Sequence, residues 1–329
     1  MNGIKYKLSI IVPTYNGEEC ISDTLDSVLT QLEEFSDKVE FIVRDNCSTD
    51  STQHIVSHYC EKYPGLINYQ RRLSTVDADT NYREAINMSK GEYVLLLGDD
   101  DLLFPNFILL TLRLLARYSD IGLLYYNRIS TSRLYEGALL KHKDPNNTFV
   151  KQLNIQDFIS LYPSGPDFIS VNVTRKECLQ KGFSYSKKSY YGVEWYANIL
   201  FGLNGYKCLS CFCPMVLQRV PNKRIWNDRA LLYVVVGMDN LFSDVSSLYP
   251  NAYNAWQSYS NEKVNKFSLI FHSIPYNRAL YKEKWNELKE KLTKKERLVA
   301  YLIIHYPVAY HPLWFFYRAI HKMIVTFSH

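Results

Sequence analysis

The chain has 329 residues, of which 47% are hydrophobic and 22% are charged. This composition supplies a large core and excludes a mainly disordered chain. The formal net charge is only +5, so charge alone gives no reason to expect a nucleic-acid-binding protein, and we expect no nucleic-acid partner.

The first third of the sequence alternates strand and helix patterns, as a doubly wound α/β sheet does. Strands are predicted at 8–12 (LSIIV), 39–45 (VEFIVRD), 67–71 (INYQR) and 91–98 (GEYVLLLG), the last of them central. Apolar residues at helical spacing predict a helix that ends near Leu32. Polar loops follow these strands at their carboxyl ends, which is where open parallel sheets bind ligands.

The middle of the chain continues the α/β pattern with one interruption. Residues 105–118 are typical of a buried helix and residues 122–129 of a strand, whereas about 130–165 is polar and predicts excursions from the sheet. A helix that stops near Gly202 or Gly205 and a strand from Tyr206 follow. We therefore expect an α/β domain over 1–225, with a donor half to about 105 and an acceptor half over about 106–225, and a helical region over 226–329.

The C-terminal region combines basic residues with aromatic ones. Residues 298–325 contain apolar runs that His305, Pro307 and Pro312 interrupt, so a membrane-spanning helix is not expected. Aromatic residues beside cations suit a helix that lies on an anionic membrane surface. A helical hairpin packed on the protein or on a second subunit, as in a homo-oligomer, is the alternative, and the sequence leaves both open.

Three aspartates, Asp99, Asp100 and Asp101, follow the strand at 91–98. Adjacent carboxylates repel one another, so their grouping needs an explanation. An acidic turn before a helix is one explanation, because Asp is favoured in turns. A divalent cation is the other, since Mg²⁺ and Mn²⁺ are held in proteins by one or two carboxylates together with substrate phosphates.

Two further motifs decide between these explanations. The segments IVPTYNGEE (11–19), VRDNCSTD (43–50) and GDDD (98–101) follow the first, second and fourth predicted strands. In this order they resemble the motifs of family 2 glycosyltransferases of the GT-A fold. With NYREAIN (81–87), they most resemble bacterial abequosyltransferases and related O-antigen or capsule glycosyltransferases.

The resemblance implies a nucleoside site in the first two loops. Pro13, Tyr15 and Glu18 would flank the nucleoside, and Glu18 would accept hydrogen bonds from the ribose hydroxyls. Asp45 would face the base, although a structural role in the loop is the alternative. The two residues after Asp45 depart from the Asp and Gly that the family usually has, which leaves the identity of the base open.

The resemblance also implies that Mn²⁺ or Mg²⁺ is bound at the aspartates. Asp101 would be the first metal ligand and Asp99 the second, with Asp99 and Asp100 also contacting the donor sugar or ribose. In an extended segment alternate side chains share a face, so we expect Asp99 and Asp101 to converge while Asp100 points elsewhere. The cation would neutralise the diphosphate as it leaves.

Three other positions are candidates on the same basis. Glu194, in YYGVEWYANILFGLNGYKC, would be the catalytic base, with an ordinary first-turn helix glutamate as the alternative. Arg83 would contact the diphosphate or sugar, although a surface or capping role fits equally. Lys223, Arg224 and Trp226 would form a mobile lid, with a solvated basic turn as the alternative.

Together these features imply an inverting, metal-dependent glycosyltransferase that uses a nucleotide-diphosphate sugar. The expected acceptor is a polyprenyl-diphosphate-linked oligosaccharide in bacterial surface polysaccharide synthesis. Seven cysteines without an apparent signal peptide favour the cytoplasm, here at the inner face of the cell membrane. A sugar-1-phosphate nucleotidyltransferase and a catalytically silent nucleotide-sugar or glycan-binding subunit remain as alternatives.

Overall fold

The computed structural model describes residues 5–131, 150–165, 168–185, 190–219 and 229–327. The chain divides into two compact units. The first consists of residues 1–187 and 195–222, and the second of residues 188–194 and 223–329.

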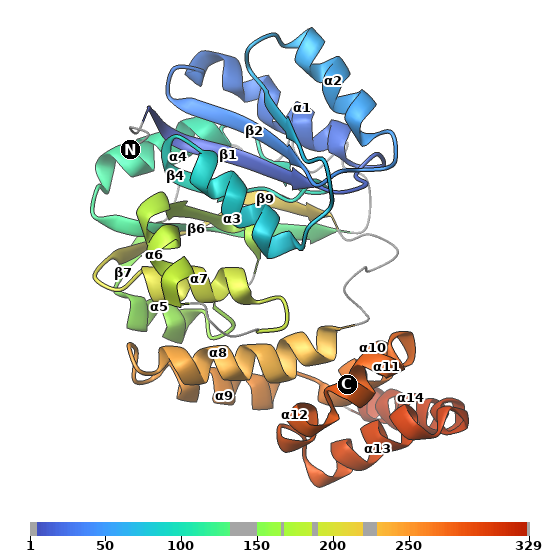
Figure 1. The fold of residues 1–329 in the computed structure, drawn as a ribbon. Helices are drawn as coiled ribbons and strands as arrows, with labels where there is room; N and C mark the ends of the chain where they lie inside the picture. Colours follow the sequence, from blue (N-terminus) through green and yellow to red (C-terminus); the bar gives the residue numbers. More distant parts are fainter. Residues whose placement is uncertain (1–4, 132–149, 166–167, 186–189, 220–228, 328–329) are drawn as a thin grey trace. The chain divides into compact units, whose positions relative to one another are not determined.

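The first unit contains the strands and the helices that cover them (Figure 1). Its strands are β1 (Tyr6–Thr14), β2 (Val39–Asp45), β3 (Asn68–Arg71), β4 (Gly91–Leu96), β5 (Leu102–Leu103), β6 (Ile121–Thr131), β7 (Val150–Leu153), β8 (Asn172–Arg175) and β9 (Lys207–Arg219). Its helices are α1 (Ile21–Leu32), η1 (Glu33–Phe35), α2 (Thr52–Lys62), α3 (Ala78–Met88), α4 (Phe107–Arg117), α5 (Ile155–Leu161), η4 (Ile169–Val171), α6 (Lys176–Tyr185) and most of α7 (Glu194–Gly202).

The strands form one mixed sheet in the order β3-β2-β1-β4-β8-β6-β9-β5, with β7 paired to β9. Strands β1 to β4 are parallel to one another, whereas β8 runs antiparallel to both of its neighbours, β4 and β6. Thr14 is in register with Asp45, and Ile11 is in register with Leu96. The loops after β1, β2 and β4 therefore leave the sheet at one edge, as the sequence predicted.

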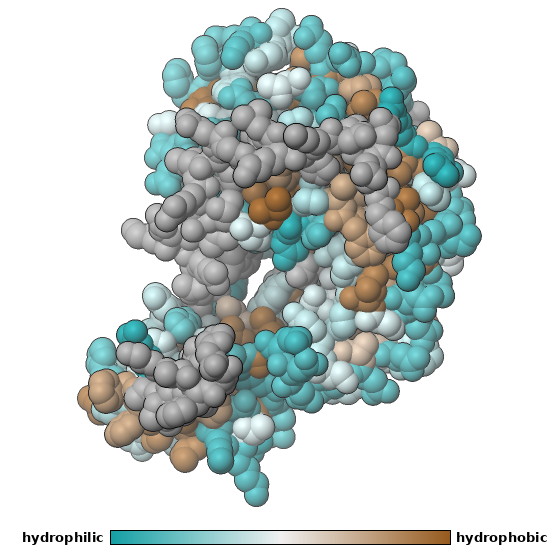
Figure 2. Space-filling view, turned by 180° about the vertical axis from the view of Figure 1, so that it is seen from behind, coloured by the Kyte–Doolittle hydropathy of each residue, from teal (hydrophilic) through white to brown (hydrophobic). Residues whose placement is uncertain are grey.

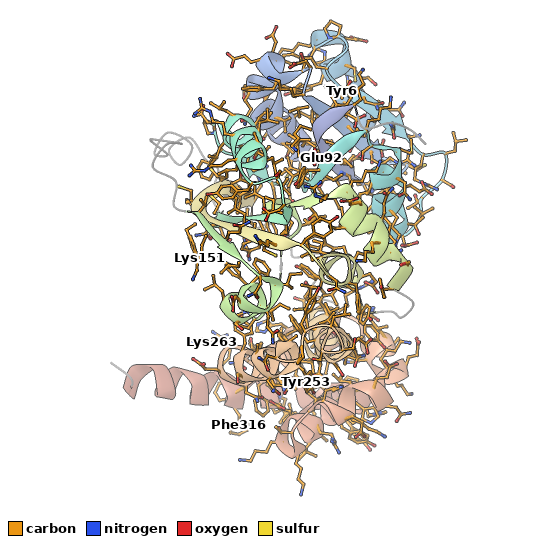
Figure 3. All side chains as sticks on the ribbon, turned by 90° about the vertical axis from the view of Figure 1, so that its left-hand side faces the viewer. Tyr6, Glu92, Lys151, Tyr253, Lys263 and Phe316 are labelled. Atoms are coloured by element: carbon orange, nitrogen blue, oxygen red, sulfur yellow. The ribbon has the colours of Figure 1, made fainter. Side chains whose placement is uncertain are left out.

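The core explains why the long strands could be predicted. Leu8, Ile10, Ile11 and Val12 of β1 are fully buried, since both faces of a central parallel strand are covered. Figure 3 labels Tyr6 on β1 and Glu92 on β4, two strands that pair in parallel. Strands β5 and β8 were not predicted, because segments of two and four residues have no recognisable period.

Helices α6 and α7 touch backbone to backbone. A Cβ atom at Gly182 would lie 1.8 Å from the Asn198 carbonyl oxygen, and one at Gly202 would lie 1.8 Å from that of Cys178. Only glycine allows this approach. The end predicted for α7 near Gly202 is confirmed, and the contact ties this helix to the one that follows β8.

The second unit is helical throughout its described residues. Its elements are the π-helix η6 (Leu232–Gly237), α8 (Met238–Val245), α9 (Ala252–Lys263), α10 (Lys266–Ser273), η7 (Ile274–Tyr276), α11 (Arg278–Glu283), α12 (Trp285–Glu290), α13 (Lys294–His305), η8 (Pro307–Ala309) and α14 (Tyr310–Phe327). It has its own apolar core, which includes Leu231, Ile270, Tyr281 and Ile303. Over the described residues, none of the helices has the length and apolar character needed to cross a membrane.

Candidate active site

The loops after β1 and β2 are fastened to each other by hydrogen bonds. The Asn16 N–H donates to Ser48 Oγ (3.0 Å), and Asn16 Oδ1 accepts from the Thr49 N–H (2.8 Å). The Gly17 N–H donates to Thr52 Oγ1 (2.9 Å). Asn16 has a φ of 56°, a conformation that asparagine tolerates better than most residues. The two loops thus form one structural piece.

Glu18 takes part in the same arrangement. Its N–H donates to Asp50 Oδ2 (3.1 Å), and its carboxylate accepts from the Ser51 N–H (2.9 Å). Glu18 is exposed and Tyr15 is 49% exposed, whereas Pro13 is buried. Glu18 and Tyr15 are therefore accessible to a nucleoside, while Pro13 shapes the backbone from inside.

Asp45, at the end of β2, is fully buried. Its Oδ1 accepts from the Ser48 N–H (2.8 Å) and Oγ (2.7 Å), and its Oδ2 accepts from the Tyr69 hydroxyl (2.8 Å) and pairs with Arg71 (3.2 Å). A buried carboxylate is stable when it is paired in this way. These contacts favour the alternative given for Asp45, a residue that organises its loop, over direct contact with a base.

The aspartates lie on a turn, which corrects the expectation of an extended segment. Strand β4 ends at Leu96, and the Asp101 N–H donates to the Gly98 carbonyl oxygen (3.1 Å). A Cβ atom at Gly98 would lie 2.7 Å from Asp101 Oδ2 and 3.0 Å from Asp100 Oδ1. In a turn, successive side chains no longer point to opposite faces as they do in a strand. The carboxylates of Asp100 and Asp101 therefore lie close together, next to Gly98.

Asp99 points to the loop after β1 instead. Its Oδ2 accepts from Thr14 Oγ1 (2.5 Å), and its carbonyl oxygen accepts from Thr24 Oγ1 (2.8 Å). Burial raises the pKa of Asp99 to about 6, because the hydrogen bond from Thr14 offsets only part of the desolvation. Asp99 therefore connects the aspartate turn to the end of β1 and to the first turn of α1.

Asp101 is the most buried of the three, with 2% of its surface exposed. It accepts hydrogen bonds from Ser170 Oγ and from the Arg219 N–H (3.3 Å). Burial, followed by the charge of Asp100, raises the pKa of Asp101 well above its usual range. Burial also raises the pKa of Asp100, although the nearby charge of Arg219 opposes the shift.

These raised pKa values show that negative charge at the turn is poorly compensated by the protein. No group of three or more His, Cys, Asp or Glu side chains among the described residues could hold a metal ion. A cation carried with a diphosphate needs only one or two carboxylates. Asp100 and Asp101 supply two carboxylates on one side of Gly98, so the residues fit Mn²⁺ or Mg²⁺ held jointly with phosphate oxygens.

Arg83, on helix α3, is held by other protein groups in this structure, and its contact with the donor stays a prediction. Arg83 pairs with Asp79 (2.5 Å), lies 4.7 Å from the centre of the Phe183 ring, and reaches Asn198 Oδ1 (3.4 Å). It therefore links α3 to the acceptor half of the sheet domain. The neighbouring Tyr82 was missed: burial and then the charge of Asp99 raise its pKa to about 12.

Glu194 begins α7 and belongs to the second unit. Its carboxylate accepts from the N–H groups of Tyr190 (2.8 Å) and Gly192 (2.7 Å). These bonds fix the turn that leads into the helix, as a first-turn glutamate does. The aspartates belong to the first unit.

Sequence reasoning also missed Arg219, Ser170 and Thr14, which contact the aspartates from other elements. Thr14 stands inside a recognised motif and could have been found there. Ser170 and Arg219 could not, because they meet Asp101 across 69 and 118 residues of sequence. The predicted lid residues Lys223, Arg224 and Trp226 lie outside the described residues.

Comparison with curated proteins gives partial matches to bacterial glycosyltransferases. The poly(ribitol-phosphate) beta-glucosyltransferase of Bacillus spizizenii is 37% identical over 95 residues, which cover 29% of this chain and 15% of that protein. Abequosyltransferase RfbV of Salmonella typhimurium is 29% identical over 116 residues, covering 35% and 34% of the two chains. The chain thus spans between 15% and 54% of the lengths of these and similar relatives. The predicted likeness to abequosyltransferases is confirmed.

Solved structures confirm the GT-A fold. Residues 1–349 of TarS from S. aureus give a TM-score of 0.59 at 17% identity, covering 92% of this chain and 87% of that one. Mannosyltransferase PcManGT from Pyrobaculum calidifontis, solved with GDP-Man and Mn²⁺, gives 0.53 at 16% identity, covering 93% and 90%. The model of the family "Glycosyl transferase family 2" matches residues 9–174, half of the sequence. The chain belongs to glycosyl transferase family 2.

Proposed function

We propose that the chain is an inverting, metal-dependent glycosyltransferase that moves a sugar from a nucleotide-diphosphate sugar to a glycan. The observation that carries the proposal is the aspartate turn, where three carboxylates with raised pKa values adjoin the loops after β1 and β2. Relatives named as glycosyltransferases, and solved neighbours with UDP, UDP-GlcNAc or GDP-Man bound, support the donor class.

In this proposal, different residues of the chain bind the nucleoside, hold the cation and accept the proton. Glu18 and Tyr15 bind the nucleoside side of the donor, and Asp101 with Asp100 or Asp99 holds the cation and the diphosphate. When bound, Mn²⁺ or Mg²⁺ neutralises the charge that develops on the leaving diphosphate. The acceptor hydroxyl oxygen bonds to the anomeric carbon, the bond from that carbon to the diphosphate breaks, and Glu194 takes the hydroxyl proton.

Glu194 has to release part of its present hydrogen bonding to act as a base. Its two backbone donors, Tyr190 and Gly192, hold the side chain in one orientation. A fixed orientation is what a general base requires.

The acceptor in this proposal is lipid-linked, and the second unit docks on the cytoplasmic leaflet. Val308 on η8 (85% exposed) and Phe315 (72%) and Phe316 (64%) on α14 are exposed apolar side chains. Figure 2 shows hydrophobic residues at the surface of both units, and Figure 3 labels Phe316 on α14. Lys294 and Lys295 at the start of α13 and Arg318 on α14 are exposed as well, so anionic headgroups are the complementary surface.

Donor hydrolysis without acceptor tests the enzymatic proposal. Each of UDP-, GDP- and CDP-linked sugars is incubated with Mn²⁺ or with EDTA, and the released nucleoside diphosphate is measured. We expect release that requires Mn²⁺ and one preferred base. A silent binding subunit would release none in either condition, and a nucleotidyltransferase would instead form nucleotide sugar from a sugar phosphate and a nucleoside triphosphate.

A thermal-shift panel identifies the donor independently of turnover. A ligand that binds only the folded state raises the melting temperature in proportion to its saturation. We expect one nucleoside diphosphate to stabilise the protein more than the others, and only with Mn²⁺ present. Equal shifts for all bases, or none, would contradict a nucleotide-sugar site.

A further inference from the structure

Arg219 ends β9 beside the aspartate turn. Its N–H donates to Asp101 Oδ1 (3.3 Å), and its guanidinium donates from Nη2 to Asp23 Oδ2 (2.6 Å). Its side chain is only 13% exposed. The Cys20 thiol adjoins the guanidinium, so the arginine is fixed between α1 and the turn.

The guanidinium is incompletely paired. Its Nε is buried and has no hydrogen-bond partner among the described residues. A buried donor without an acceptor is unfavourable, and arginine offers donors in a fork that matches phosphate oxygens. This unsatisfied Nε–H group therefore suits a phosphate oxygen that a ligand brings to the side chain.

The guanidinium of Arg219 lies beside the part of α1 that contacts the aspartates. Its partner Asp23 directly precedes Thr24, whose Oγ1 donates to the Asp99 carbonyl oxygen (2.8 Å). Arg83, the arginine that the sequence pointed to, is engaged by Asp79. Arg219 thus places a positive charge next to the turn where a divalent cation would bind.

We propose that Arg219 is a resident counter-charge that makes cation binding at the aspartate turn depend on the donor diphosphate. This inference rests on the proposed function. Without donor, the positive guanidinium repels a divalent cation, and the Arg219 N–H occupies one oxygen of Asp101. The diphosphate brings negative charge that accommodates both cations and accepts hydrogen bonds from Arg219, including one from Nε. By linkage, cation and diphosphate strengthen each other's binding by the same factor.

The test measures two affinities in Arg219→Gln. Mn²⁺ binding without nucleotide is followed by electron paramagnetic resonance, and UDP, GDP and CDP binding with saturating Mn²⁺ by calorimetry, with each monophosphate for comparison. We expect Mn²⁺ alone to bind roughly fivefold or more tightly than to wild type, and the preferred diphosphate to bind at least fivefold more weakly. The monophosphate should change less.

Three further variants separate this role from general effects. Asp23→Asn keeps the guanidinium but removes its outer partner, so Mn²⁺ alone should bind more weakly and the diphosphate at least as well as in wild type. Arg219→Lys keeps the charge without the fork, so Mn²⁺ alone should bind as in wild type. Lys207→Gln makes the same charge change at the other end of β9, where Lys207 pairs with Asp120 (2.8 Å), and should change neither affinity.

Opposite shifts of the two affinities in Arg219→Gln support the inference, because loss of folding would weaken both. Unchanged affinities, or a parallel loss of both, overturn it. If wild type binds a diphosphate with Mn²⁺ while Arg219→Gln behaves like wild type, only this inference fails. If wild type binds none of the three diphosphates, the proposed function is wrong, and the inference that rests on it is wrong as well.

Discussion

The aspartate turn links protonation to folding. The folded-state pKa of Asp99, about 6, lies above its usual value of 3.8, so the folded protein holds the proton more tightly than the unfolded chain. Its contribution to stability is fully present below about pH 3.8 and is lost as the pH rises through about 6. Without a bound cation, the protein therefore retains a local destabilisation at neutral pH.

Asp99→Asn removes this charge and tests the linkage. Asn can still accept the hydrogen bond from Thr14. Without metal, we expect the variant's free energy of unfolding to exceed that of wild type at pH 8 by on the order of 1 kcal/mol, and by much less at pH 4. Urea denaturation at both pH values measures this. An equal gain at both pH values would show that charge is not the cause.

Gly98→Ala tests the approach of the two carboxylates. The added Cβ would lie 2.7 Å from Asp101 Oδ2, so the carboxylates must move apart. We expect Mn²⁺-dependent nucleotide binding to weaken by about tenfold or more, measured by calorimetry. Leu73→Ala, at a side chain that is 99% exposed, is the control and should bind as wild type does. Normal binding by Gly98→Ala would exclude Asp100 and Asp101 as joint ligands.

At the scale of elements, the sequence predicted the longer helices and strands, in which apolar residues recur with a regular period. Strands β1, β2, β4 and β6 and helices α1, α4 and α7 lie close to their predicted positions, because each buries a full face or stripe. The segment after β4 was predicted as extended when its side chains were assigned to faces, although the aspartates also favoured a turn, and a turn is what forms there. Strand β8, a central neighbour of β4, is recruited by tertiary pairing alone.

The N-terminus of α7 carries the next prediction. Glu194→Gln keeps one hydrogen-bond acceptor but removes the basic carboxylate, so turnover should fall at least 100-fold while donor affinity stays within twofold of wild type. Steady-state kinetics and calorimetry measure the two. Glu177→Gln makes the same change in the first turn of α6 and should keep its turnover. A lower melting temperature with normal turnover would assign Glu194 a structural role only.

Helix α14 carries the membrane prediction. Replacing both Phe315 and Phe316 by Ser removes large exposed apolar side chains, so co-sedimentation with vesicles that contain phosphatidylglycerol should weaken by about tenfold or more. Turnover of a soluble donor in hydrolysis should stay normal. Met88→Ser, in the first unit, is the matched control. Unchanged vesicle binding would contradict the membrane role. A change from dimer to monomer in light scattering would instead identify the helix face as a subunit contact.

At the scale of the whole molecule, the fold class was predictable and the complete site was not. The three motifs are local, so Asp45, Glu18 and Asp101 could be named from the sequence. Their partners come from β9, η4 and α1, and only folding brings these to the turn. For the same reason Asp45 and Arg83, predicted as ligand contacts, are engaged by protein groups that the sequence did not reveal.

The bonds between the loops after β1 and β2 have a consequence for altering donor preference. Asn16, Glu18, Ser48 and Ser51 each hold a partner in the opposite loop. Replacing only one of these loops by that of a relative would remove one partner of each hydrogen bond between them. The two loops would then become disordered before the donor preference could change. Laboratory evolution of this enzyme should therefore be started from libraries in which both segments vary together.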